Sequence, residues 1–213
     1  DVYKRQGDDA GLFSAKKTDL IFSTDVSNSN VHFPKSLEPE LIAYRACCVA
    51  ASDIPACGGT LKWLSITLVM PTTDLNWIKQ FAKGIKLFTK NYKVPVIGGD
   101  LIKGRECSVS VGVCGEVDKK NFLSRGGAQA DDLIFISGTL GEDRLGLKVL
   151  SSKKKNLSNE EKKYLKRFLK PKVHTSLAKN LQNIATSCID ISDGLLSDLG
   201  HICNQSNKGA EIN

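Results

Sequence analysis

The sequence predicts an α/β protein (α+β, with mixed sheets) that is divided into two domains. Short apolar or β-branched runs alternate with stretches of helical spacing, which is typical of mixed α/β folds. A polar break at 118–121 interrupts this pattern, and 213 residues with 41% hydrophobic content suffice for a sizeable core. We therefore expect an N-terminal α/β domain over residues 1–117 and a C-terminal α/β domain over residues 118–213.

The first domain is expected to contain two helices among several strands. One helix should begin at Pro39, because proline suits a first helical turn, and should end around 52–55 at a second proline. Asp74 is placed to cap the other helix, whose apolar residues recur at helical spacing. The strands are expected at 20–23, 63–70, 94–97 and 108–117, and those at 20–23 and 94–97 are expected to be buried.

The second domain is expected to be mainly helical, with two buried strands. Ser158 and Glu161 have the spacing of a capping box and predict the start of a helix. The other elements expected here are strands at 132–137 and 188–191 and helices over 145–150, over 175–184 and from 195 onwards. We expect another strand to start at 211–213, where the sequence stops, and therefore expect this domain to be incomplete.

Composition favours a cytoplasmic protein. No stretch approaches the roughly 20 consecutive apolar residues of a membrane-spanning helix, and no secretory signal pattern opens the chain. The seven cysteines are odd in number and include no C-x-x-C pair, so neither a disulfide framework nor a zinc site is expected.

The net charge of +7 comes from one segment. Residues 148–172 hold ten Lys and Arg against two Glu, a local net of +8, and the rest of the chain sums to −1. A lysine-rich solvated helix face is the simpler interpretation, and a patch for an anionic partner is the alternative. The segment lacks the interleaved aromatic residues of a single-strand binding platform, so no nucleic-acid partner is expected.

Aspartates recur at the ends of small-residue or apolar runs. They occur in Gly7-Asp8-Asp9, Ser23-Thr24-Asp25, Gly98-Gly99-Asp100 and Asp190-Ile191-Ser192-Asp193-Gly194. Any single one could be a turn residue or a helix N-cap, and Asp8 and Asp193 could serve in these ways. As a set they predict carboxylates converging on Mg²⁺ and phosphate, since Mg²⁺ prefers oxygen ligands.

In order along the chain, these motifs resemble those of the thiamine-monophosphate kinase family. That family belongs to an ATP-binding superfamily which also includes aminoimidazole ribonucleotide synthetase and selenophosphate synthetase. The matching pieces are Gly7-Asp8-Asp9-Ala10, Ser23-Thr24-Asp25, Asn30 to Phe33, Ser52-Asp53, Gly98-Gly99-Asp100, Ser124 to Ala128, and Asp190 to Leu195. The resemblance implies the two-domain fold of that superfamily, with the second domain truncated.

The resemblance also implies an activity and roles for individual residues. Such kinases transfer the γ-phosphoryl group of ATP onto thiamine monophosphate by direct in-line transfer, giving thiamine diphosphate, with several Mg²⁺ ions and no covalent nucleophile. Gly99, Arg125 and Ser192 would bind ATP, and His32 would contact the substrate. Arg125 would also assist catalysis. The implied metal ligands are Asp9, Ser23, Thr24, Asp25, Asp53, Asp100, Asp190 and Asp193.

The family further implies a homodimer joined through the N-terminal sheets. Another ATP-dependent synthetase of the superfamily, of the aminoimidazole ribonucleotide or selenophosphate type, is an alternative. A selenophosphate enzyme would be expected to carry a reactive cysteine near its N-terminus, and no cysteine precedes Cys47. Asp53 could merely end its helix, and His32 alone would more often be an ordinary surface or core histidine. A basic nucleic-acid-binding protein that uses residues 148–172 is the alternative of another class.

Overall fold

A five-stranded mixed sheet is the base of the computed structural model, which describes residues 11–14, 18–152 and 154–212. The sheet has the strand order β1-β2-β5-β3-β4, in which β3 and β4 are parallel and the other neighbours are antiparallel. Its strands are β1 (Gly11–Ser14), β2 (Asp19–Asn28), β3 (Thr60–Met70), β4 (Val96–Lys103) and β5 (Ser108–Val117).

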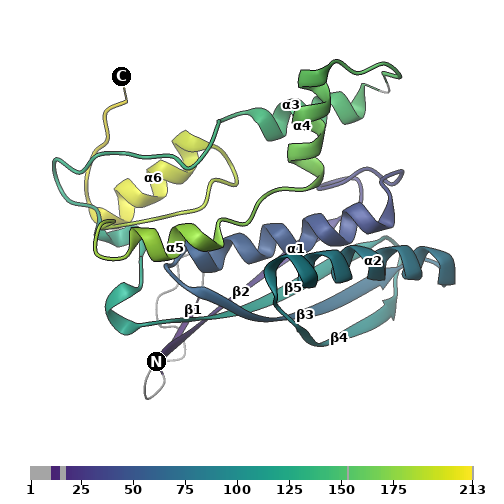
Figure 1. Cartoon of the computed structure of the whole chain (residues 1–213), viewed down its shortest axis with the longest axis horizontal. Coiled ribbons are helices and arrows are strands. Elements are labelled where there is room, and N and C mark those ends of the chain that lie inside the picture. Colours follow the sequence, from purple (N-terminus) through teal and green to yellow (C-terminus); the bar gives the residue numbers. More distant parts are fainter. Residues whose placement is uncertain (1–10, 15–17, 153, 213) are drawn as a thin grey trace.

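Two long helices, α1 (Pro39–Ala56) and α2 (Leu75–Tyr92), cover one face of this sheet (Figure 1). The helix α2 connects the parallel strands β3 and β4, as a crossover between parallel strands usually does. It begins as expected, because the Asp74 carboxylate accepts the backbone N–H groups of Asn76 and Trp77. The core lies between this helix layer and the sheet and includes the fully buried Ile54, Leu64 and Phe88.

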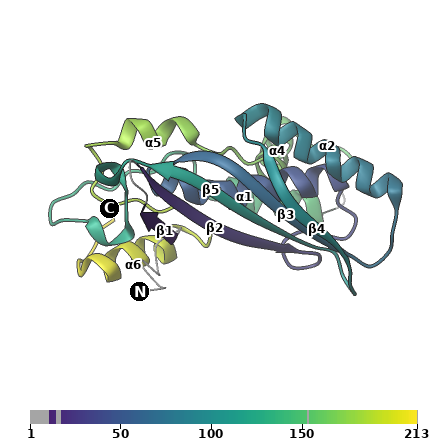
Figure 2. The ribbon, with the colours of Figure 1, turned by 90° about the horizontal axis from the view of Figure 1, so that it is seen from below.

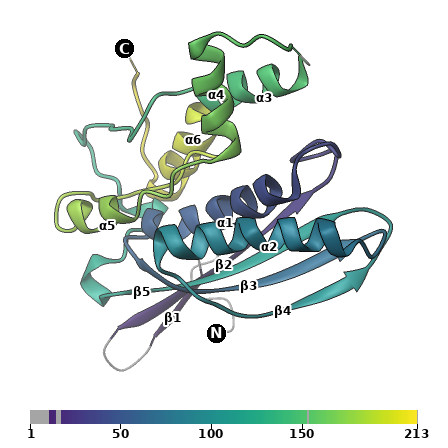
Figure 3. The same ribbon diagram turned by 45° about the vertical axis from the view of Figure 1, so that its right-hand side comes forward.

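The remaining helices lie on the side of α1 that faces away from the sheet (Figure 3). The helix α4 is anchored to α1 by Arg45, which donates a hydrogen bond to the Phe168 carbonyl (2.5 Å) and stacks on the Phe168 ring. The helices on this side are α3 (Glu142–Ser151), α4 (Asn159–Leu169), α5 (Thr175–Leu181) and α6 (Leu195–Ser206). Two 3-10 turns, η1 (Lys119–Asn121) and η2 (Arg125–Gly127), lie between β5 and α3 in the chain. The capping box of Ser158 and Glu161 opens α4 as the sequence predicts.

The opposite face of the sheet carries no helix in the described part of the chain (Figure 2). Phe22 and Val26 of β2 lie on this face and are 47% and 46% exposed, and the half-buried Trp63 packs against Phe22. Exposed apolar side chains that are grouped on one face of a sheet are typical of an interaction face.

Two expectations about the first domain were wrong. The helix α1 continues through Pro55 to Ala56, so Asp53 lies inside its last turn and not at its end. Burial of Ile54 and Cys57 against the rest of the core stabilises this additional turn, although proline removes one helical hydrogen bond. The strand expected to be buried at 94–97 is the exposed edge strand β4, and it continues through Asp100.

The strands expected at 132–137 and 188–191 are not formed in the described structure. Both segments lack regular secondary structure, and Leu133 and Phe135 are 79% and 84% exposed. A strand is stabilised by hydrogen bonds to a partner strand, and apolar residues alone cannot supply them. No helix among the described residues is long and apolar enough to cross a membrane.

Candidate active site

The alternation of β2 directs Ser23 and Asp25 toward α1. Both share a face of the strand with the fully buried Ile21, whereas Phe22, Thr24 and Val26 lie on the uncovered face. The Ser23 hydroxyl donates a hydrogen bond to Oδ2 of Asp53 at 2.5 Å. The last turn of α1 therefore brings Asp53 against the part of β2 that carries Asp25.

Ser52, the neighbour of Asp53, connects α1 to the segment before α6. Its hydroxyl lies 2.5 Å from Oδ2 of Asp190 and donates to it. Two successive residues of α1 thus connect it to different parts of the chain. The Asp53 carboxylate is bound by β2, and the Ser52 hydroxyl binds the carboxylate of Asp190. Asp53 and Asp190 are among the site residues expected from the sequence, whereas Ser52 is not.

Asp25 and Asp190 are electrostatically coupled. The pKa of Asp25 is raised, first by burial and then by repulsion from Asp190, and the electrostatic influence of His32 lowers it in part. The pKa of Asp190 is likewise raised, first by burial and then by repulsion from Asp198, while Ser52 and Arg125 lower it. Carboxylates that repel one another in a half-buried site create a negative potential that attracts cations.

Arg125 lies in η2, close enough to Asp190 for its charge to lower the pKa of that carboxyl. Its turn is attached to α6, because the Ser206 hydroxyl donates to the Arg125 carbonyl (3.0 Å) and accepts the Ala128 N–H (3.1 Å). A Cβ at Gly127 would lie 1.9 Å from the carbonyl oxygen of Thr186, so glycine is required there. The turn therefore holds the Arg125 guanidinium within electrostatic reach of Asp190, and its expected role as a phosphate clamp stays a prediction.

Ser192 and Asp193 are exposed in the loop that enters α6. Asp193 is not the N-cap; that position belongs to Gly194, whose φ of 119° suits glycine. The backbone N–H groups of this loop are bound by Asp198, a buried residue that the sequence analysis missed. In sequence, Asp198 resembles any acidic residue in a first helical turn, and only the fold reveals its contacts.

Thr24 and Asp100 lie apart from these carboxylates. Asp100 pairs with Thr67 in the β3–β4 register, on the sheet face that the helices do not cover, and Thr24 is exposed on the same face. Three strand spacings, roughly 14 Å, separate β2 from β4. The described structure therefore does not bring Asp100 to Asp25.

Gly99 is packed against the neighbouring strand. A Cβ at this position would lie 1.9 Å from the carbonyl oxygen of Ile66, so the close approach of β3 and β4 is itself a reason for glycine. Its expected contact with ATP stays a prediction.

His32 lies in the loop after β2, where it is exposed. Its Nδ1 accepts the backbone N–H of Asn28 at 3.0 Å, which fixes the orientation of the ring. Its influence on the Asp25 pKa places it near the carboxylates. Asp9 lies outside the described residues, so its expected role as a metal ligand stays a prediction.

The donor set fits Mg²⁺ that is shared with phosphate. Within residues 11–14, 18–152 and 154–212, no three His, Cys, Asp or Glu side chains converge closely enough to hold a metal ion by themselves. Magnesium in phosphoryl-transfer sites is usually bound by one or two carboxylates, with water and substrate phosphates as the remaining ligands. Asp25, Asp53 and Asp190 can supply carboxylates of that kind.

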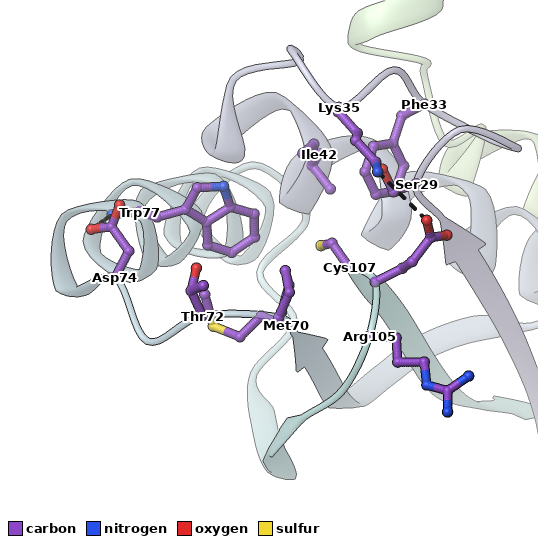
Figure 4. Close-up of a pocket in the computed structure, with 12 residues that line it drawn as sticks. Ser29, Phe33, Lys35, Ile42, Met70, Thr72, Asp74, Trp77, Arg105 and Cys107 are labelled. Carbon is purple, nitrogen blue, oxygen red and sulfur yellow. Dashed lines mark hydrogen bonds and ion pairs between the residues drawn. The ribbon is translucent and has the colours of Figure 1, made fainter.

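A separate pocket of about 240 Å³ lies where β2, β3 and β5 meet the beginnings of α1 and α2 (Figure 4). Phe33, Met70 and Trp77 line it, and Lys35 and Glu106 form an ion pair of 3.5 Å beside it. None of the expected site residues lines this pocket. It is therefore distinct from the carboxylates around Asp25.

A family model and curated relatives assign this chain to the same family. The family model described as AIR synthase related protein, N-terminal domain, matches residues 7–117. Thiamine-monophosphate kinase of Buchnera aphidicola subsp. Schizaphis graminum is 40% identical over 97% of this chain and 64% of its own length. The kinase of that name from Aquifex aeolicus is 35% identical over 97% of this chain and 67% of its own length. This chain thus spans less than two thirds of the length of the first of these relatives.

Solved structures agree with this family. The complex of AaThiL with AMPPCP and TMP superimposes with a TM-score of 0.92 at 35% identity, over 97% of this chain and 66% of that one. The hydrogenase maturation protein HypE in complex with ATP has a TM-score of 0.67 at 18% identity, over 88% of this chain and 56% of that one, and shares the fold alone. The chain belongs to the AIR synthase related proteins and, among them, to the thiamine-monophosphate kinase family.

Proposed function

We propose that this protein is an ATP-dependent kinase that converts thiamine monophosphate to thiamine diphosphate. The observation that carries the proposal is the link from β2 through the last turn of α1 to the loop before α6. Ser23 of β2 donates to Asp53, the neighbouring Ser52 donates to Asp190, and Asp190 repels Asp25. The names of the relatives support the substrate, and the AaThiL complex with AMPPCP and TMP supports the use of an ATP-like nucleotide.

The reaction joins two phosphate groups, and their mutual repulsion is the main obstacle to it. Mg²⁺, when bound, would neutralise that charge and the charge that develops in the transition state. Asp25, Asp53 and Asp190 would hold Mg²⁺, and Arg125 would bind ATP phosphates through its planar guanidinium. Asp9, Ser23, Thr24, Asp100 and Asp193 remain further candidate ligands, Gly99 and Ser192 candidate ATP contacts, and His32 a candidate substrate contact.

No side chain is assigned as a covalent nucleophile. A phosphate oxygen of thiamine monophosphate would attack the γ-phosphorus of ATP in line with the departing ADP oxygen. The chain's contribution in this proposal is to orient both phosphates and to stabilise their charge. We further propose that the boundary at 117/118 divides an N-terminal from a C-terminal domain, and that the protein works in the cytoplasm.

We also propose a homodimer joined through the uncovered face of the sheet. The exposed Phe22 and Val26 and the adjacent Trp63 support this, because apolar side chains on a sheet face favour contact with a second sheet. Replacing Val26 with Glu should convert the dimer to a monomer in light scattering after size-exclusion chromatography. A monomeric unsubstituted protein, or a V26E variant that stays dimeric, would contradict this interface.

The activity is tested by incubating ATP and thiamine monophosphate with a protein that carries this sequence at the full length of its relatives. Thiamine diphosphate should form only when Mg²⁺ is present, and D190N should lose most of this activity. D131N is the matched control, because Asp131 is an exposed loop residue, and it should retain full rate. Absence of product from the unsubstituted protein, or an unaffected D190N variant, would refute the proposed reaction.

The same preparation separates the alternative functions. A synthetase of the superfamily would use ATP with its own substrate and ignore thiamine monophosphate. A nucleic-acid binder acting through residues 148–172 would bind oligonucleotides with an affinity that falls steeply with salt and is unchanged in D190N.

A further inference from the structure

One carboxylate organises the entrance to α6. Asp198 lies in the first turn of this helix and is 3% exposed. Its Oδ2 accepts the backbone N–H groups of Ser192 (2.9 Å), Asp193 (3.2 Å) and Gly194 (3.1 Å). One buried oxygen therefore binds three successive amides of the loop that carries the candidate ATP and metal contacts.

This arrangement differs from ordinary N-capping. A cap residue usually precedes the helix and accepts N–H groups from its first turn. Here the N-cap is Gly194, which has no side chain for this purpose, and the acceptor lies inside the helix and reaches back to the preceding loop. The hydrogen bonds are charge-assisted, which strengthens them and compensates the burial of the carboxylate.

The loop is also fixed at its other end. Asp190 is bound by the Ser52 hydroxyl of α1, so residues 190–194 are held between α1 and the first turn of α6. Because the N–H groups of 192–194 point at Asp198, they are not available to bind a phosphate themselves. The loop can therefore contact a ligand only through its side chains. The directions of these side chains depend on the backbone conformation, which the hydrogen bonds to Asp198 fix.

We propose that Asp198 is a positioning residue, which sets the loop 190–194 so that Asp190, Ser192 and Asp193 can face Mg²⁺ and the nucleotide. This inference rests on the proposed function, which assigns those three residues to the site. It assigns no contact between Asp198 and the substrates, since its interacting oxygen is already occupied by backbone amides.

The test uses D198N and D198A, with D131N as the control. Amide hydrogen exchange, followed by NMR, reports directly on the N–H groups of 192–194. In the unsubstituted protein these amides should be protected, and D198A should lose that protection. D198N keeps one oxygen acceptor and nearly the same shape, so it should give an intermediate result even if D198A folds poorly. D131N should leave all three amides unchanged.

Mn²⁺ binding, measured by isothermal titration calorimetry, provides the second readout. Loss of a group that orients metal ligands typically costs 10–100-fold in affinity, so we expect D198A to bind Mn²⁺ about tenfold or more weakly, with D198N between it and the unsubstituted protein. In an active full-length protein, D198N should raise KM for ATP more than it lowers kcat.

The two hypotheses fail in different ways. If the unsubstituted protein bound no Mn²⁺ and made no thiamine diphosphate, the proposed function would be wrong. If the unsubstituted protein bound Mn²⁺ and both Asp198 variants bound it equally well with protected amides, the positioning role would be wrong and the proposed function would stand.

Discussion

The Ser52 hydroxyl on α1 and the Asp190 carboxylate in the loop before α6 are 2.5 Å apart. This contact joins the helix layer over the N-terminal sheet to the C-terminal part of the chain. Since Asp53 is bound by Ser23 of β2, the last turn of α1 is the element on which both sides of the candidate site meet.

Replacing Ser52 with Ala should destabilise the protein and release Asp190. A hydrogen bond to a charged group contributes on the order of 1.5–3 kcal/mol, so we expect a loss of about 1.5 kcal/mol in the free energy of unfolding. Urea denaturation followed by circular dichroism measures it. The control is S151A, which changes an exposed serine in α3. Equal midpoints for S52A and S151A would show that the contact does not contribute to stability.

Replacing Asp25 with Asn should stabilise the metal-free protein at pH 7. Burial and the repulsion of Asp190 raise the Asp25 pKa above its ordinary 3.8, so the folded state binds this proton more tightly than the unfolded chain does. Stability is then greatest below the ordinary pKa and declines as the pH rises through the raised one. D25N removes that decline, and we expect its Tm at pH 7 to be about 2 °C higher.

The D25N comparison has two internal checks. The difference in Tm should shrink as the pH is lowered through the raised pKa of Asp25, because the carboxyl takes up its proton in the unsubstituted protein. Added Mg²⁺ should raise the Tm of the unsubstituted protein more than that of D25N, because only the former retains this carboxylate. A D25N variant that is less stable than the unsubstituted protein at pH 7, with the control D131N unchanged, would contradict the electrostatic account.

Elements with local signals could be predicted from the sequence. The N-cap Asp74, the capping box of Ser158 and Glu161, and the strand Ser108–Val117 are all present in the structure as expected. Each depends on residues within a few positions of one another, which the sequence displays directly. The family motifs likewise indicated Asp53 and Asp190, which Ser23 and Ser52 bind, and Asp25, whose pKa Asp190 raises.

Features that depend on distant partners could not be predicted in this way. The segment 132–137 has the apolar composition of a strand but lacks a neighbour in the described chain. Strand register decides which face Asp100 occupies, and register involves β3, far from it in sequence. Ser52 was missed for the same reason, since its importance lies in a contact with residue 190. Asp198 was missed although its partners, residues 192–194, are only four to six positions before it, because they are backbone amides and no side chain in the sequence marks them.

Replacing Arg45 with Lys should weaken the attachment of α4 to α1. The guanidinium donates to the Phe168 carbonyl and lies 4.0 Å from the centroid of the Phe168 ring, a planar arrangement that an ammonium group cannot reproduce. We expect a loss of about 1 kcal/mol in the free energy of unfolding and faster proteolysis of α3 and α4. R144K, at an exposed position of α3, should change neither quantity. Indistinguishable proteolysis of R45K and R144K would rule out this role.

The two neighbouring glycines of β4 offer a matched pair of substitutions. A Cβ at Gly99 would lie 1.9 Å from the Ile66 carbonyl oxygen, whereas a Cβ at Gly98 would have no atom within 4 Å. G99A should therefore separate β3 from β4 locally and cost about 2 kcal/mol in the free energy of unfolding, while G98A should leave it nearly unchanged.

Nucleotide binding by the same pair distinguishes the two reasons for a glycine at position 99. If the glycine serves the packing of β3 against β4, G99A should lose stability. Any decrease in its affinity for ATP should then be an indirect effect of the displacement of β4. If G99A kept the stability of G98A but bound ATP more weakly, the glycine would be required by the nucleotide and not by the strand. Thermal denaturation and calorimetric titration with Mg²⁺ and a non-hydrolysable ATP analogue separate these outcomes, because strand packing affects both measurements and nucleotide contact affects only the second.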